Sequence, residues 1–373
     1  MNPFDRLANP WVRHLASYEP GKPIEEVARE LGFSSVEGIA KLASNENPLG
    51  PSPRALDAMR KAAAEMHRYP DGSAFYLTRA VAKALAVDER SLVFGAGSNE
   101  LIELLAHVFL GPGLSIVMAD RAFVVYRLVA AAQNAGTIAV PMRDGFTHDL
   151  AAMAEAVTPK TRLVFIANPN NPTGTAVSPA EIEAFLKRVP DHVITVFDEA
   201  YVELLDESER PESLRYVREG RPVVVLRTFS KVYGLAGLRI GYAVAPPPCA
   251  ALLHRVRQPF NVNAMALAAA EAALEDHAHV ERTRRVVREG LAFFERELKA
   301  LSIPFVPSKA NFLLVRTGRG REVFQALQAE KVIVRPMDGY GLPDYVRITI
   351  GTPEENQQCL EALKKVLSRG VGA

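Results

Sequence analysis

The segment RTFSKVYGLAGLRIGY (227–242) brings together the residue types that could form and hold a covalent amine adduct. Two hydroxyl residues, Thr228 and Ser230, flank Lys231. Arg239 follows eight residues later with a planar guanidinium that suits a phosphate group. An amine held among phosphate-binding groups is the equipment for a Schiff base with pyridoxal phosphate. A surface lysine beside a structural arginine is the plainer alternative for this segment taken alone.

Three other polar clusters follow short apolar runs: GAGSNE (95–100), ANPNNPTG (167–174) and DEAY (198–201). If the runs are parallel strands, these clusters lie at their carboxyl ends, where α/β proteins bind ligands. A phosphate needs backbone amides, hydroxyls and a cation around it. The candidates for that role are Gly97, Ser98, Asn99, Thr228, Ser230 and Arg239.

A pyridoxal ring makes three further demands. Its nitrogen needs a fixed carboxylate, for which Asp198 is the candidate. Its phenolic oxygen needs hydrogen-bond donors, and Asn171 and Tyr201 are placed to supply them. Its flat face needs an aromatic partner, and Phe123 can stack there. Each residue has a plainer role, as a helix cap, a turn residue or a core side chain, but their joint position at successive strand ends favours a binding site.

The elements that would position these groups alternate between residues 91 and 245. Runs rich in β-branched residues are predicted as strands at 92–94, 115–118, 137–140, 163–166, 193–197, 223–226 and 240–244. Helical patterns lie between most of them, at 99–109, 124–133, 148–156 and 179–188. This alternation predicts an α/β fold with a large domain whose mostly parallel seven-stranded sheet lies between helices.

The two ends of the chain differ from this alternating region. Residues 1–45 are predicted to form an N-terminal arm and part of a small domain, with a short helix at 24–31. The large cofactor-binding domain is predicted to cover 46–262. It is expected to begin with one helix at 54–66 and a second helix that ends at residue 85. Residues 263–373 are predicted to form a smaller α+β domain. Its helices are expected from about 263, at 280–301, 322–329 and 354–367, and its strands at 312–315, 332–334 and 346–350.

Composition limits the functional class. The chain has 373 residues, 48% hydrophobic and 23% charged, with a net charge of +1. Scattered charge of both signs argues against nucleic acid or an anionic membrane surface as a partner. The only cysteines, Cys249 and Cys359, are too far apart to suggest a disulfide framework or a metal cluster. No metal site is therefore expected. No apolar stretch is long enough for a signal peptide or a membrane span, so a cytoplasmic protein is expected.

The chain resembles the histidinol-phosphate aminotransferase family, which belongs to the fold type I pyridoxal-phosphate enzymes. The shared motifs are SNENPLGPSP, RYPDG, GAGSNELIELL, NPNNPTG, DEAY, RTFSKVYGLAGLRIGY and RITIGTPEEN, and they extend over nearly the whole chain. The resemblance implies that Lys231 is the Schiff-base lysine and proton carrier and that Asp198 is the partner of the ring nitrogen. It also implies that Tyr201 and Asn171 are partners of the ring oxygen.

The same resemblance implies a substrate site and an oligomer. It places Arg335 and Arg347 against the substrate anion, with Tyr18 and Asn47 completing the pocket. It implies a homodimer in which Tyr69, a packing residue on sequence grounds alone, reaches the cofactor phosphate of the neighbouring subunit. The implied reaction transfers an amino group between L-histidinol phosphate and 2-oxoglutarate, in histidine biosynthesis.

Two departures from the family pattern keep alternatives open. Asn99 replaces the usual acid of the phosphate loop, and Arg121, Ala122 and Phe123 stand where the family usually has Pro-Thr before a residue that is often Tyr. The missing hydroxyl leaves open an aromatic amino acid aminotransferase that uses phenylalanine or tyrosine. A phosphothreonine decarboxylase is the next alternative. The sensor domain of a transcription regulator comes last, because the first 40 residues show no helix-turn-helix pattern.

Overall fold

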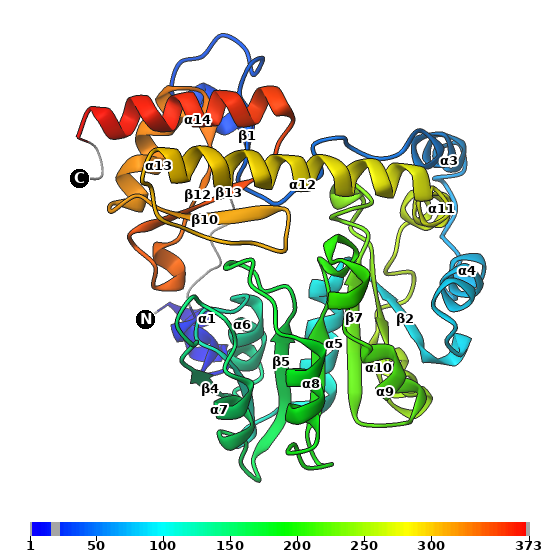
Figure 1. The fold of residues 1–373 in the computed structure, drawn as a ribbon. Coiled ribbons are helices and arrows are strands. Elements are labelled where there is room, and N and C mark those ends of the chain that lie inside the picture. The colour runs from blue at the N-terminus through cyan, green and yellow to red at the C-terminus, as the bar shows by residue number, and fades with distance from the viewer. Residues whose placement is uncertain (1, 16–22, 371–373) are drawn as a thin grey trace.

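The larger part of the molecule is a seven-stranded sheet with the strand order β2-β8-β7-β6-β5-β3-β4. The structure, a computed structural model, describes residues 2–15 and 23–370 (Figure 1). Within this sheet β8 is antiparallel to both of its neighbours, β2 and β7, and the other pairings are parallel. The predicted mostly parallel sheet is therefore confirmed. The strands are β2 (Leu92–Gly95), β3 (Ser115–Ala119), β4 (Gly136–Val140), β5 (Thr161–Ala167), β6 (Ile194–Asp198), β7 (Val223–Thr228) and β8 (Gly241–Val244).

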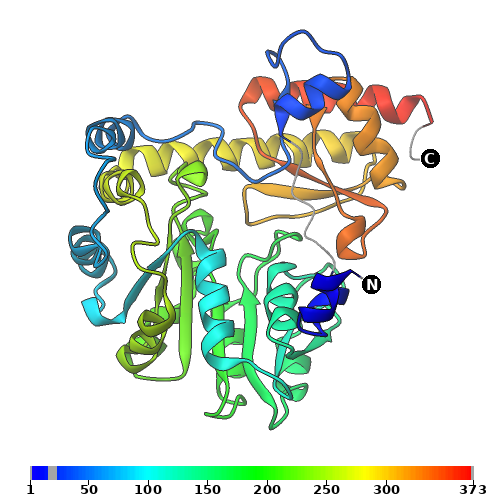
Figure 2. The ribbon, with the colours of Figure 1, turned by 180° about the vertical axis from the view of Figure 1, so that it is seen from behind.

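Helices cover both faces of this sheet, which explains why the central strands read as continuous apolar runs. On one face α5 packs against α6 and α10, and on the other α7 packs against α8 (Figures 1 and 2). Between them lies a core that includes the fully buried rings of Phe165, Phe197 and Phe229. The helices are α5 (Ser98–Phe109), α6 (Val125–Ala132), α7 (Leu150–Glu155), α8 (Pro179–Leu186), α9 (Ser213–Arg218) and α10 (Pro247–Val256).

The smaller part is built on a four-stranded antiparallel sheet with the order β12-β13-β10-β9. Its apolar residues form a second core with α12, α13 and α14, including Phe294, Leu313 and Ile348. The predicted α+β character of this region is confirmed. The elements are α12 (His277–Ala300), β9 (Phe305–Val306), β10 (Phe312–Arg316), α13 (Gly320–Ala329), β12 (Arg335–Pro336), β13 (Tyr345–Thr349) and α14 (Pro353–Ser368).

The N-terminal region connects to both parts. Strand β1 (Ala40–Lys41) pairs in parallel with β11 (Val332–Ile333), and α2 (Ile24–Glu30) packs beside them through Val27 and Ala28. The short α1 (Pro3–Leu7) lies near the larger part, where the Trp11 indole donates to the carbonyl of Ala132. This arrangement places the residues that follow β1 between the two sheets.

Two helices follow residue 262, where the boundary between the large and small domains is predicted. The position of that boundary stays a prediction. Helix α11 (Ala264–Leu274) packs against α3 (Pro53–Ala63) and α4 (Phe75–Leu85), and its buried alanines belong to the larger core. Helix α12 then runs from the larger part across the smaller one (Figure 1). The packing thus assigns α11 to the larger part and makes α12 the connection between the two.

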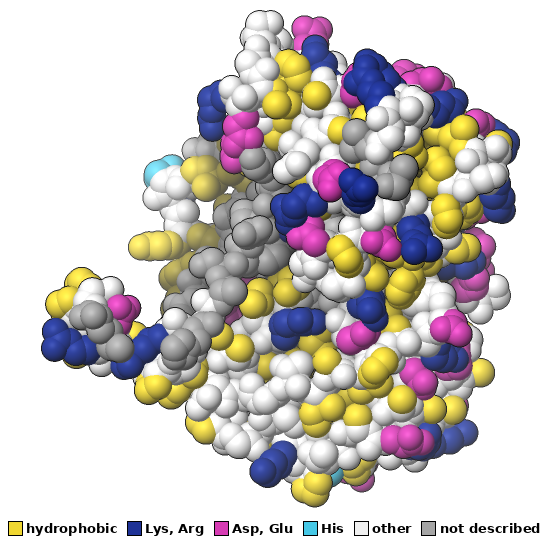
Figure 3. Space-filling view, turned by 90° about the vertical axis from the view of Figure 1, so that its left-hand side faces the viewer, with side chains coloured by type: hydrophobic (Ala, Val, Ile, Leu, Met, Phe, Trp, Pro, Cys, Tyr) yellow, Lys and Arg dark blue, Asp and Glu magenta, His cyan; other side chains and the backbone are white. Residues whose placement is uncertain are grey.

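The charged side chains on the surface reflect the nearly balanced net charge of the sequence. On the face shown in Figure 3, basic and acidic side chains are interspersed with apolar and neutral ones rather than gathered by sign. Within residues 2–15 and 23–370, no helix is both long and apolar enough to cross a lipid bilayer.

Candidate active site

A cavity of about 290 Å³ lies at the carboxyl ends of β5, β6 and β7, where the two parts of the molecule meet. Side chains from both sheets and from the segment after β1 line it. Most of the residues selected from the sequence are gathered here, although they are spread along the chain from residue 98 to residue 347. Those that line the cavity are Ser98, Asn99, Phe123, Asn171, Asp198, Tyr201, Thr228, Ser230, Lys231, Arg239, Arg335 and Arg347.

The amino terminus of α5 and Arg239 form one end of the cavity. Helix α5 begins at Ser98, so the free N–H groups of its first turn point out of the helix toward the cavity end. Gly97 precedes it with a positive φ of +80°, and a Cβ atom at that position would overlap the Arg239 guanidinium. Arg239 can lie against the loop because residue 97 has no side chain. Thr228 and Ser230 line the same end, and the Ser230 N–H donates to the Thr228 Oγ1 at 3.0 Å.

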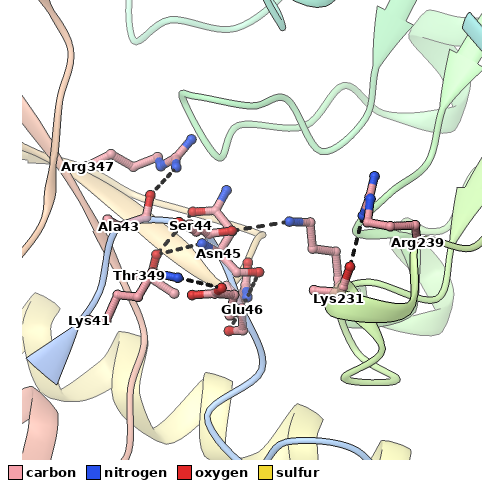
Figure 4. A network of polar contacts seen from close by, with 11 residues as sticks. Lys41, Ala43, Ser44, Asn45, Glu46, Lys231, Arg239, Arg347 and Thr349 are labelled. Carbon is pink, nitrogen blue, oxygen red and sulfur yellow. Dashed lines mark hydrogen bonds and ion pairs between the residues drawn. The ribbon is translucent and has the colours of Figure 1, made fainter. Parts of the chain in front are cut away.

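Lys231 lines the cavity from the turn that follows β7. Its Nζ is 3.4 Å from the carbonyl oxygen of Ser44 (Figure 4). Burial, and after it the positive charge of Arg347, lowers the pKa of Lys231 to about 8, while Glu46 opposes the shift. A buried lysine in this state has a substantial neutral fraction at physiological pH, which is the form that acts as a nucleophile or a base.

Asp198 ends β6 with its carboxylate buried. The Tyr126 hydroxyl donates to the Asp198 Oδ2 at 2.7 Å, and the Ala200 N–H donates to Oδ1 at 3.3 Å. Burial raises the pKa of Asp198, and the Tyr126 bond opposes that rise. Tyr126 itself is fixed by stacking on Phe165, with ring centroids 4.4 Å apart. Phe123 meets the edge of the same tyrosine at a centroid distance of 5.7 Å and lines the cavity.

Two hydrogen-bonding side chains, Asn171 and Tyr201, line the same cavity as Lys231, and each is oriented by a second residue. The Arg347 Nη1 donates to the Asn171 Oδ1 at 2.6 Å, so the NH₂ group of Asn171 points away from Arg347. The Asn45 Nδ2 donates to the Tyr201 hydroxyl oxygen at 2.9 Å. Burial raises the pKa of Tyr201 to about 12, so its hydroxyl keeps its proton at neutral pH. Both groups can therefore act as donors.

Comparison with known proteins places this arrangement in a family. Residues 37–363 match the family model described as aminotransferase class I and II. The chain belongs to this aminotransferase family. Its members use pyridoxal phosphate, so the cofactor and the fold type I architecture expected from the sequence are confirmed.

Relatives of this aminotransferase extend over nearly the full chain. The histidinol-phosphate aminotransferase of Akkermansia muciniphila is 51% identical over 98% of this chain and 99% of its own. That of Moorella thermoacetica is 49% identical over 96% of this chain and 92% of its own. Among solved structures, the Sinorhizobium meliloti histidinol-phosphate aminotransferase in complex with pyridoxal-5'-phosphate superposes with a TM-score of 0.88, at 26% identity over 97% of this chain and 98% of its own. The resemblance found in the sequence is confirmed.

The aminotransferase cavity fits the cofactor residue by residue. The α5 amino terminus and Arg239 offer donors and positive charge for a phosphate, and the buried Asp198 offers a carboxylate for a ring nitrogen. Tyr201 and Asn171 offer donors for a ring oxygen, and Lys231 offers the amine. Asn99, the departure from the family pattern, lines the cavity with the others. This set of donors matches the groups that pyridoxal phosphate presents.

Among the described residues, three that were expected at the site do not line this cavity within one chain: Gly97, which lies behind it against Arg239, and Asn47 and Tyr69. Asn47 is buried just outside it, where its Nδ2 donates to the Val232 carbonyl at 2.8 Å and to the Thr283 Oγ1 at 3.1 Å. Tyr69 is 83% exposed and stacks on Phe260 instead of facing the cavity. Tyr18 lies outside the described residues.

Among the lining residues that were not selected from the sequence, Tyr126 and Asn45 support side chains that were. Tyr126 supports Asp198 but sits in DRAFVVY, where it reads as a core aromatic three residues after Phe123. Asn45 contacts Tyr201 but sits in a loop rich in turn-forming residues, where an Asn is expected for local reasons. No local signal marked Tyr126, because its partner Asp198 lies 72 residues away in the sequence.

Proposed function

We propose that this aminotransferase transfers the amino group of L-histidinol phosphate to 2-oxoglutarate, a step of histidine biosynthesis. The observation that carries the proposal is the match to proteins named histidinol-phosphate aminotransferase, at 51% and 49% identity over nearly the entire chain. The cavity supports it with two arginines on adjacent strands. Arg335 and Arg347 are register partners across β12 and β13, and both line the cavity.

The chain's own residues carry out the proton transfers in this proposal. Pyridoxal phosphate, when bound, supplies an aldehyde that condenses with amines and a ring that withdraws electrons from the neighbouring carbon. Asp198 keeps the ring nitrogen protonated, because a buried carboxylate favours a cation beside it. Lys231, with a pKa lowered to about 8, would take a proton from the substrate carbon that bears the amino group and return it to the cofactor carbon bonded to the same nitrogen.

The anionic ends of both substrates require the same kind of partner. Histidinol phosphate has a phosphate and 2-oxoglutarate has carboxylates, and a guanidinium fork pairs with either group. Arg335 and Arg347 are proposed as these partners. Arg347 also donates to the Asn171 Oδ1 and to the Ala43 carbonyl oxygen, so a substrate anion would share its guanidinium with these two acceptors.

The protein is proposed to act as a homodimer. Tyr69 and Phe260 are both exposed on one chain, at 83% and 46%, and they stack at a centroid distance of 4.8 Å. Exposed aromatic pairs of this kind are typical of protein interfaces. In the dimer, Tyr69 reaches the cofactor phosphate bound by the neighbouring chain.

The substrate is tested by following a single half-reaction. Cofactor-loaded protein is mixed with histidinol phosphate and, separately, with phenylalanine, and conversion of the bound cofactor to its amine form is followed by absorbance. We expect faster conversion by histidinol phosphate. Faster conversion by phenylalanine would favour an aromatic aminotransferase, and release of carbon dioxide from phosphothreonine would favour a decarboxylase.

A pair of variants shows whether phosphate recognition lies where we propose. Arg335→Gln is expected to slow conversion by histidinol phosphate about 10- to 100-fold, since a charge-assisted hydrogen bond contributes roughly 1.5–3 kcal/mol. It should change conversion by phenylalanine much less. Arg316→Gln is the matched control, because Arg316 ends β10 of the same sheet but pairs with Asp344 at the surface.

A further inference from the structure

Asn45 is a buried residue that joins the smaller sheet to the cavity wall of the larger one. It is only 2% exposed and has a positive φ of +55°, a conformation that Asn adopts more readily than most residues. Its backbone carbonyl accepts from the Asn311 Nδ2 at 3.0 Å, and its N–H donates to the Thr349 Oγ1 at 3.0 Å. Two hydrogen bonds from its backbone to neighbouring side chains therefore fix the position of Asn45 independently of its own side chain.

Thr349 determines which way the Asn45 amide faces (Figure 4). The Thr349 hydroxyl already accepts the Asn45 N–H, and its own single proton is donated to the Asn45 Oδ1 at 3.1 Å. With Oδ1 on the Thr349 side, the Nδ2 group must lie on the other side, where it is 2.9 Å from the Tyr201 hydroxyl oxygen. The amide thus presents a donor, and not an acceptor, to Tyr201.

A donor at this place controls the direction of the Tyr201 proton. A phenol has one proton to donate, and it cannot be donated toward an NH₂ group. The Tyr201 ring is held edge-on against Phe312 at a centroid distance of 5.4 Å, and Tyr201 is almost fully buried. Among the residues that the structure describes, the Tyr201 hydroxyl has an incoming bond from Asn45 and lines the cavity with Lys231. Its proton is left to point into the cavity.

We propose that Asn45 is a positioning residue that, oriented by Thr349, obliges Tyr201 to donate its hydrogen bond to the cofactor's ring oxygen. The inference rests on the proposed placement of the cofactor beside Tyr201. It makes β13 a control element for both donors of that oxygen, because Arg347 orients Asn171 and Thr349, two residues later on the same strand face, orients Asn45.

The test is Asn45→Asp, which keeps the size of the side chain and its backbone preference but replaces the donor by an acceptor. The carboxylate then accepts the Tyr201 proton and withdraws it from the ring oxygen. Without this donor, the anionic ring oxygen holds the proton on the neighbouring Lys231 nitrogen more strongly. We expect the pH midpoint of the absorbance change of the cofactor-loaded protein to rise by about one unit.

A double-variant cycle separates this effect from the mere addition of a negative charge. Tyr201→Phe removes the hydroxyl, so N45D should add little to the midpoint in a Y201F background. An equal shift in both backgrounds, or no shift in either, would overturn the proposal. A wild-type protein that shows no such absorbance band would instead overturn the cofactor placement on which the inference rests.

Variants of Thr349 test the same orientation of the Asn45 amide if N45D does not fold. Thr349→Val keeps the shape but removes the hydroxyl, which frees the Asn45 amide to turn, and the midpoint is again expected to rise. Thr349→Ser keeps the hydroxyl and should titrate like the wild type. If T349V and T349S titrate alike, the relay through Asn45 is wrong. The dissociation constant of pyridoxal phosphate, measured on the same proteins, reports directly on the lost hydrogen bond.

Discussion

Among the residues that line the cavity, Lys231 has an environment that changes its reactivity. Burial and the nearby Arg347 lower its pKa to about 8, against an ordinary lysine value of about 10.5. At pH 7 about one molecule in ten then has a neutral amine, compared with about one in three thousand for an unperturbed lysine. Because only the neutral amine attacks an aldehyde, this environment makes Lys231 about 300-fold more available for cofactor capture.

The pH dependence of cofactor capture follows from this shift. Raising the pH removes the Lys231 proton, so the rate at which cofactor-free protein forms its covalent adduct with pyridoxal phosphate should rise through a midpoint near pH 8. Stopped-flow absorbance measures this rate. Lys231→Ala should show no covalent phase at any pH. A wild-type midpoint near 10 would mean that Lys231 is not buried as the structure describes.

Tyr126 should affect cofactor affinity through Asp198. Tyr126→Phe removes the hydrogen bond to the Asp198 Oδ2 and leaves the buried carboxylate less well supported. Since a bond to a charged group contributes about 1.5–3 kcal/mol, we expect the dissociation constant of pyridoxal phosphate to rise about 10-fold.

Tyr216→Phe is the matched control for Y126F. Tyr216 also donates to a carboxylate, that of Glu183, but lies away from the cavity. It should leave cofactor affinity unchanged in a titration followed by fluorescence. An equal loss of affinity in both variants would show a general effect of destabilisation.

Residue types indicated which side chains line the cavity better than which side chains support them. Lys231, Asp198 and Arg239 could be selected because each has a charge that a pyridoxal group requires; all three line the cavity, and their roles stay predictions. Asn45 and Tyr126 could not be selected in this way, because each acts on another protein side chain and contacts it over a long sequence separation, 156 residues for Asn45 and Tyr201. Such contacts depend on the fold and leave no local pattern.

At the scale of elements, the α5 amino terminus shows how backbone conformation shapes the cavity. Gly97→Ala places a Cβ against the Arg239 guanidinium and also strains a positive φ. We expect the affinity for pyridoxal phosphate to fall about 10- to 100-fold, because displacement of Arg239 removes a charged phosphate contact.

Gly113→Ala is the control for G97A. Gly113 has nearly the same φ, +82°, but nothing lies within 4 Å of an added Cβ. It should therefore show the backbone strain as a lower melting temperature without the loss of affinity. If the two variants bind the cofactor equally well, Arg239 does not contribute to the phosphate site.

The elements themselves were largely predictable. All seven strands of the larger sheet coincide with short apolar runs. Six of them are almost entirely buried, as expected of strands covered on both faces, whereas the edge strand β4 is largely exposed. Helix α10 was missed because it begins in a run of three prolines, which indicates a turn unless the prolines occupy the first helical positions. Helix α9 and strands β1 and β9 were too short for a periodic pattern.

At the scale of the whole molecule, the cavity is assembled by two cores that meet over it. The larger sheet contributes Asp198 and Lys231, and β13 of the smaller sheet contributes Arg347. Bonds cross between the two parts at Arg347 to Asn171 and at Asn45 to Tyr201. Folding of the smaller part is therefore a condition for orienting the donors of the larger one.

The proposed dimer predicts that two inactive chains can restore one another. Lys231→Ala abolishes a site in its own chain, whereas Tyr69→Ala should weaken the site of the neighbouring chain. In a mixed dimer of these variants, one of the two sites has both native residues. Refolding the variants together in equal amounts should recover about a quarter of the wild-type activity. If the mixture recovers no activity, Tyr69 does not act in the site of the neighbouring chain.

Trapping the covalent bond between Lys231 and pyridoxal phosphate would show directly which amine holds the cofactor in this cavity. The cofactor-loaded protein is reduced with borohydride, digested and analysed by mass spectrometry. We expect a stable phosphopyridoxyl group on the peptide that contains Lys231 and on no other lysine. Labelling of a different lysine, or no labelled peptide from protein that has bound the cofactor, would contradict it.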